Sequence, residues 1–159
     1  MPAEIAIQSS AQKVTGALES IGCKIEEVVK GTGILFVYGG QYYVASAAED
    51  LTYLCVYFPK FGDVSGFPSR LSADDAIHEL NARAQLARVW IDRSQLHASA
   101  ETLLEPSMQL TSVLERLLKT LQHIVFEARV FQRFAGAQKG NSEPDNPPPE
   151  VSHHPMALH

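Results

Sequence analysis

The sequence has few of the residue patterns that mark catalytic or metal-binding proteins. Its 159 residues include two cysteines and one tryptophan, and the cysteines show no C-x-x-C spacing. It contains no H-E-x-x-H pattern, no nucleophile elbow, no P-loop and no dinucleotide-binding glycine motif. Because each of those chemistries needs its groups at a fixed spacing, the sequence indicates a non-enzymatic protein with no metal and no cofactor.

The chain also lacks a basic excess and a long apolar run. Its net charge is −5 and its pI is about 5.6, which argues against general binding to nucleic acid or to an anionic membrane. No segment approaches 18 consecutive apolar residues, and the first residues show no basic stretch followed by an apolar core. We therefore expect a cytoplasmic protein whose partners are neither nucleic acid nor membrane.

The two cysteines, Cys23 and Cys55, each fall in an apolar stretch with the character of a strand. A reduced thiol in such a stretch behaves as a small hydrophobic side chain, and this is the interpretation that we favour. A disulfide or a reactive thiol is the alternative.

The most regular feature of the sequence is a long helical pattern from Ser107 to Ala135. Ser107 is a candidate N-cap after Pro106, and Gly136 is a candidate stop signal. Apolar residues recur there at steps of three and four, so that they share one side of a helix. These residues are Leu110, Leu114, Leu117, Leu121, Ile124, Ala128 and Phe131.

The rest of the chain predicts two further helices and two groups of strands. A helix is expected at Ile7–Ile21, and a second opens at Ser72 and carries Ala76, Ile77, Leu80 and Ala84. Short joints and β-branched or aromatic residues predict an antiparallel meander followed later by a hairpin. The strands are expected at Cys23–Val29, Ile34–Tyr38, Gln41–Ala47, Leu51–Phe58, Ala87–Asp92 and from Leu96 to about Glu101.

These elements define an α+β fold in the order α-β-β-β-β-α-β-β-α, with an antiparallel sheet and three helices. A Gly39-Gly40 pair is expected to form a two-residue hairpin turn. The segment Pro59–Leu71 reads as a loop, and its Phe61 and Phe67 are expected to fold back on the core or to line a groove. We assign residues 1–136 to one domain and residues 137–159, which contain five prolines, to a disordered tail.

This order resembles the YbjN family and the related class I type III secretion chaperones, over roughly residues 8–135. The segments that carry the resemblance are Phe36-Val37-Tyr38, Tyr42-Tyr43-Val44, Leu80-Asn81 and Arg88-Val89-Trp90-Ile91-Asp92. The resemblance implies a chaperone-like α+β domain, commonly a homodimer, without known catalytic residues. In the secretion chaperones the domain binds an extended segment of a client, and a role in regulating sensory transduction is ascribed to YbjN relatives. The chain differs from the chaperones in its less acidic pI and its proline-rich tail.

Two groups of residues are candidate contacts with a partner. Phe126, Val130 and Phe134 lie opposite the apolar seam of the long helix, where a helix packed on one sheet should be polar. They predict an interface with a second subunit or a client, unless the loop Pro59–Leu71 covers them. Trp90, flanked by Arg88, is expected on the outer side of its strand, either as an interface anchor or half covered by a neighbouring helix.

The sequence thus predicts a non-enzymatic protein-binding or regulatory module that forms a homodimer, with strand-edge pairing or the helical aromatic patch as its means of contact. The alternative is a regulatory domain that senses a small molecule. In that case the meander aromatics Phe36, Tyr38, Tyr42 and Tyr43 would line a pocket.

Overall fold

The computed structural model describes residues 9–29 and 33–140 of the chain. They form an α+β fold of three α-helices and one six-stranded antiparallel sheet, in the predicted order. The elements are α1 (Ser10–Ser20), β1 (Lys24–Val29), β2 (Gly33–Tyr38), β3 (Gln41–Ala47), β4 (Tyr53–Asp63), the short 3-10 helix η1 (Val64–Gly66), α2 (Arg70–Arg83), β5 (Ala87–Asp92), β6 (Gln95–Leu103) and α3 (Leu110–Gly140).

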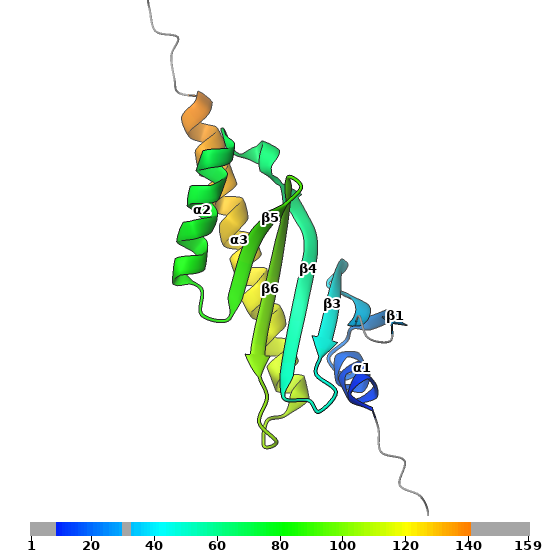
Figure 1. Ribbon diagram of the computed structural model, residues 1–159. Helices are drawn as coiled ribbons and strands as arrows, with labels where there is room; N and C mark the ends of the chain where they lie inside the picture. The colour runs from blue at the N-terminus through cyan, green and yellow to red at the C-terminus, as the bar shows by residue number, and fades with distance from the viewer. Residues whose placement is uncertain (1–8, 30–32, 141–159) are drawn as a thin grey trace, which may run out of the picture.

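The sheet has the strand order β1-β2-β3-β4-β6-β5, so that β1 and β5 are its edges. Figure 1 shows α3 running behind the sheet, with α2 beside its C-terminal half and α1 near its N-terminal end. The described helices all pack on one face of the sheet, and the opposite face carries no helix. The fold is therefore a two-layer structure with one uncovered sheet face.

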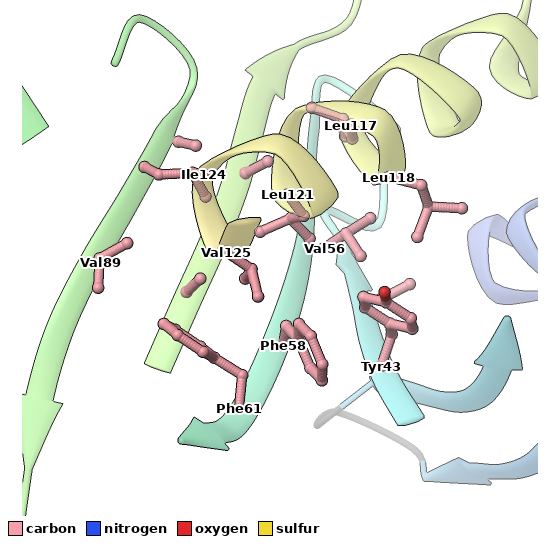
Figure 2. Close-up of a cluster of buried hydrophobic side chains, with 14 of the residues drawn as sticks. Tyr43, Val56, Phe58, Phe61, Val89, Leu117, Leu118, Leu121, Ile124 and Val125 are labelled. Carbon is pink, nitrogen blue, oxygen red and sulfur yellow. The ribbon is translucent and has the colours of Figure 1, made fainter. Parts of the chain in front are cut away.

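The core lies between α3 and the sheet. Leu114, Leu117 and Leu121 of the predicted seam are fully buried, and Figure 2 shows α3 side chains meeting Phe58 of β4 and Val89 of β5. The buried stripe is wider than the seam, since it also includes Val113, Leu118 and Val125. The extra width follows from the contacts of α3, which packs on α1 and α2 as well as on the sheet.

The meander hairpin confirms the role predicted for its glycines. Gly39 and Gly40 take φ values of 57° and 77° between β2 and β3. Positive φ at both central residues defines the hairpin turn that matches the twist of antiparallel strands. The turn fixes the pairing of Phe36 with Tyr43, whose rings stack 5.6 Å apart within the core.

The predicted start of α2 at Ser72 is wrong. The N-cap is Ser69, whose hydroxyl accepts a hydrogen bond from the backbone N–H of Ser72, while the Ser72 hydroxyl accepts one from the N–H of Ser69. This reciprocal capping box extends the helix by almost one turn toward its N-terminus. As a result Ala73, which the prediction left outside the helical stripe, is fully buried.

The predicted loop at Pro59–Leu71 is wrong in its first part, because β4 continues to Asp63. A bulge shifts the pairing with β6 between Phe58 and Gly62, and Lys60 takes a φ of 50° within it. The bulge takes Pro59, which has no backbone N–H, out of the regular ladder. The prediction that Phe61 and Phe67 fold back on the core is confirmed, since both are buried.

Both predicted ends of the long helix are wrong. Ser107 lies in a turn closed by a hydrogen bond from the N–H of Met108 to the carbonyl of Glu105, and α3 begins at Leu110. At the other end α3 continues through Gly136 to Gly140. A glycine inside a helix costs only about 1 kcal/mol relative to alanine, so it does not by itself end a helix. The rest of the predicted tail, residues 141–159, lies outside the described residues.

Candidate interaction surfaces

The first candidate surface is a groove between α2 and α3. It is lined by Glu79 and Arg83 of α2 and by Phe126, Glu127, Val130, Phe131 and Phe134 of α3, and its volume is about 370 Å³. The structure therefore brings together the three apolar residues that the sequence singled out on the back of the long helix. Phe126 is 64% exposed and Phe134 is 70% exposed, while Val130 between them is half-buried.

Charged side chains of α2 lie beside the aromatic rings of the groove. Arg83 places its guanidinium 5.6 Å from the ring centre of Phe131 and lies 3.7 Å from the carboxylate of Glu79. The cation over the ring and the ion pair keep charged groups at the margin of the groove. Its centre is apolar, which suits a partner that presents an apolar side chain.

The segment Pro59–Leu71, which the sequence suggested as a possible cover, does not cover the groove. Phe61 and Phe67 belong to the core cluster, and their rings are buried there. The end of β4 contacts α3 through polar groups: Gln132 donates a hydrogen bond to the carbonyl of Asp63, at 2.9 Å. Phe126 and Phe134 remain exposed within the described part of the chain.

The second candidate surface is the uncovered face of the sheet. Arg88 and Trp90 lie on the face of β5 opposite the buried Val89, as predicted from the alternation. Trp90 is 37% exposed and is covered by aromatic neighbours on the sheet, not by a helix. The two groups of predicted contact residues thus lie on opposite faces of the protein.

Trp90 belongs to an aromatic cluster that the sequence analysis missed. The rings of Tyr57, His97 and Trp90 lie nearly parallel, and each pair of ring centres is 5.5 to 5.7 Å apart. His97 is only 5% exposed, and its Nδ1 contacts the Tyr57 hydroxyl and accepts a hydrogen bond from the N–H of Lys60 at 3.4 Å. The alternation of β6 places His97 on the outer face of the sheet. The rings that cover it come from β4 and β5, so the sequence of β6 alone could not show that His97 is buried.

The four aromatic residues proposed to line a ligand pocket do not share one. Phe36 and Tyr43 are buried in the core, and Tyr38 packs against it. Tyr42 is mostly exposed and lies next to Tyr43 in β3, so it points to the other face of the sheet. The alternation of β3 therefore separates Tyr42 from the other three rings, which are packed in or against the core.

A third feature is an open hollow of about 620 Å³ where the ends of β4, β5 and β6 meet the connection from α2 to β5. Arg88 and Glu101 are the two charged residues in its lining. The Tyr53 hydroxyl donates a hydrogen bond to Oε2 of Glu101, at 2.5 Å. That hydrogen bond and burial raise the pKa of Tyr53, so its hydroxyl keeps its proton at neutral pH.

The remaining chemistry of the described residues is limited. Cys23 and Cys55 are free thiols, so the disulfide alternative is not formed. The described residues contain no group of three or more histidine, cysteine, aspartate or glutamate side chains placed to hold a metal. None of the described helices is both long enough and apolar enough to cross a lipid bilayer.

The architecture defines a class of two-layer α+β domain with an antiparallel sheet covered by helices on one face. A solved structure with this fold is the crystal structure of YbjN, a proposed transcription regulator from E. coli. The likeness has a TM-score of 0.55 at 11% identity, and it covers 75% of this chain and 90% of that chain. At this identity the likeness shows a YbjN-like fold. Neither a protein-family model nor a curated protein matches the sequence.

Proposed function

We propose that this protein is a non-enzymatic regulatory or protein-binding module that acts as a homodimer through the groove between α2 and α3. The observation that carries the proposal is the exposure of Phe126 and Phe134 on either side of Val130. Full burial of a phenylalanine side chain is worth about 1.5–3 kcal/mol, so a chain that leaves two of them in water gains substantially from a partner. The YbjN-like fold supports a regulatory role, because YbjN is itself described as a proposed regulator.

The arrangement of the two surfaces suggests a division of roles. A dimer formed on the helical side leaves the uncovered sheet face of each subunit accessible. Trp90 and Arg88 on that face provide an aromatic anchor and a cation for a client or regulatory protein, and both residue types are common at the centre of protein interfaces. One domain can thus associate with itself and hold a second partner.

The test is the mass of the protein in solution, measured by light scattering over a dilution series. We expect a dimer for the wild type and a monomer for the double variant Phe126→Ser/Phe134→Ser, with an unchanged far-UV circular dichroism spectrum. Leu103→Ser is the matched control, since Leu103 is 74% exposed but lies outside the groove. A wild type that is monomeric at every concentration, or a double variant that remains dimeric, refutes the proposed interface.

A regulatory domain that senses a small molecule is the second candidate function. It does not use the meander aromatics, since Phe36, Tyr38 and Tyr43 are packed in or against the core and Tyr42 lies on the other face of the sheet. The observation in its favour is the hollow with Arg88, Glu101 and Tyr53 at the end of the sheet.

A further inference from the structure

The hollow at the end of β4, β5 and β6 holds two opposite charges that do not pair with each other. Arg88 comes from β5 and Glu101 from β6, and Arg88 lies opposite Ser99, two residues from Glu101 on the same face. Residues in this diagonal relation are about 7–8 Å apart, within reach of two long side chains. Yet the ion pairs of the described residues include none made by Arg88.

Tyr53 explains why the pair does not form. It lies on β4, which is on the other side of β6 from β5. By donating its hydroxyl to Oε2 of Glu101, it draws the carboxylate toward β4 and away from Arg88. Glu101 thus has a partner on β4, while the guanidinium of Arg88 makes no ion pair among the described residues and can donate to another acceptor.

We propose that this hollow binds a free α-amino acid with an apolar side chain. Arg88 would hold the carboxylate of the ligand, and the Oε1 atom of Glu101 would accept hydrogen bonds from its ammonium group. Leu86 and Leu103 in the wall of the hollow offer apolar surface for the side chain of the ligand. A ligand that carries both charges matches the two fixed protein charges, whereas a simple anion or cation would leave one of them unsatisfied.

The size of the site agrees with this ligand. A volume of about 620 Å³ lies within the range of small-molecule pockets, roughly 300–1,000 Å³, and leaves room for water around an amino acid. The hollow lies at the end of the sheet beside the C-terminus of α2 and shares no lining residue with the groove between α2 and α3, so the inference does not depend on the proposed dimer.

The test uses the full chain, labelled with ¹⁵N and titrated with L-leucine while amide chemical shifts are followed. We expect shifts at Arg88, Glu101 and their strand neighbours that saturate with ligand. Isovalerate and isoamylamine, which each carry only one of the two charges of leucine, should bind much more weakly. Arg88→Gln and Glu101→Gln should each weaken leucine binding about 10- to 100-fold, as expected for loss of a hydrogen bond to a charged group.

Tyr53→Phe is the decisive variant, because it retains both charges and removes only the hydroxyl that separates them. We expect it to let Glu101 pair with Arg88 and to weaken leucine binding at least several-fold, with a folded spectrum. Arg93→Gln, which removes a charge at the other end of β5, should bind leucine as the wild type does. The inference is refuted if leucine causes no saturable shifts in the wild type. It is also refuted if isovalerate binds as tightly as leucine, or if Tyr53→Phe and Arg88→Gln bind leucine normally. The Phe126→Ser/Phe134→Ser variant should still bind leucine, which separates this result from that of the dimer.

Discussion

The side chain of Asn81 makes hydrogen bonds to both backbone polar groups of Val89. Its Nδ2 donates to the Val89 carbonyl and its Oδ1 accepts from the Val89 N–H, each at 2.8 Å. Since β5 is an edge strand, these groups would otherwise point to solvent or to the strand of another molecule. One side-chain amide from the last turn of α2 thus satisfies the backbone hydrogen-bonding groups in the middle of this sheet edge, as a neighbouring strand would.

The first prediction follows from this amide. Asn81→Ala should lower the free energy of unfolding by about 1–3 kcal/mol, because it leaves the N–H and C=O of Val89 without their partner. Urea denaturation followed by circular dichroism measures the change. Gln85→Ala is the control, since Gln85 is exposed in the connection that follows α2.

Asn81→Asp sharpens the same test. A carboxylate can accept from the Val89 N–H but cannot donate to the Val89 carbonyl, which it repels. We therefore expect stability between that of the wild type and that of Asn81→Ala, and a faster aggregation rate for Asn81→Ala as the edge is exposed. Equal stability of the Asn81→Ala variant and the wild type would show that the two hydrogen bonds do not hold the edge.

The sheet and the long helix were predictable because local periodicity determines them. The steps of three and four from Leu110 to Phe131 placed Leu114, Leu117 and Leu121 on the side that the structure buries. Alternation in β5 likewise separated Val89 from Trp90. In both elements the core lies on the same side along the whole segment, so the apolar residues recur with the period of that element and can be recognised from its sequence alone.

The positions that were not predicted depend on contacts between distant segments. Either Ser69 or Ser72 can cap α2, and local sequence does not decide between them; the longer helix is the one that buries Ala73. His97 alternates like an outward residue, but Tyr57, 40 positions away in the chain, and Trp90 cover it. The hollow with Arg88 and Glu101 likewise requires knowing that β6 lies between β4 and β5.

The turn between β5 and β6 predicts a stabilising substitution. Arg93 and Ser94 have φ values of 48° and 67°, a turn of the type that favours glycine at its second position. Ser94→Gly should raise the free energy of unfolding by about 0.5–1 kcal/mol, because glycine removes the strain of a left-handed residue. The carbonyl of Ser94, which accepts from the N–H of Val64 at 3.0 Å, is retained.

Thermal unfolding tests this prediction, with Ser99→Gly as the control of opposite sign. Ser99 lies within β6, where glycine adds only freedom to the unfolded chain and weakens the strand. We expect a higher melting temperature for Ser94→Gly and a lower one for Ser99→Gly. A fall for both variants would mean that the turn is not strained.

The last prediction concerns the two thiols. Burial raises the pKa of Cys23 from 9.0 to about 11, and the residue is only 6% exposed. Burial also raises the pKa of Cys55, but that side chain is only half-buried and lies on the uncovered sheet face. With Ellman's reagent near neutral pH, one thiol per chain should therefore react in the folded protein, and the second only after unfolding, because the thiolate is the reactive form.

The same shift makes stability depend on alkaline pH. The unfolded chain loses the Cys23 proton near its ordinary pKa of 9.0, while the folded chain keeps it until about pH 11. The contribution of the protonated Cys23 thiol to the free energy of unfolding is therefore fully present below pH 9 and falls as the pH rises toward 11. Over this interval the urea midpoint should fall less for Cys23→Ala than for Cys55→Ala, because only the Cys55→Ala variant retains the Cys23 thiol. Rapid labelling of Cys23 in the folded Cys55→Ala variant would contradict the burial that causes the shift.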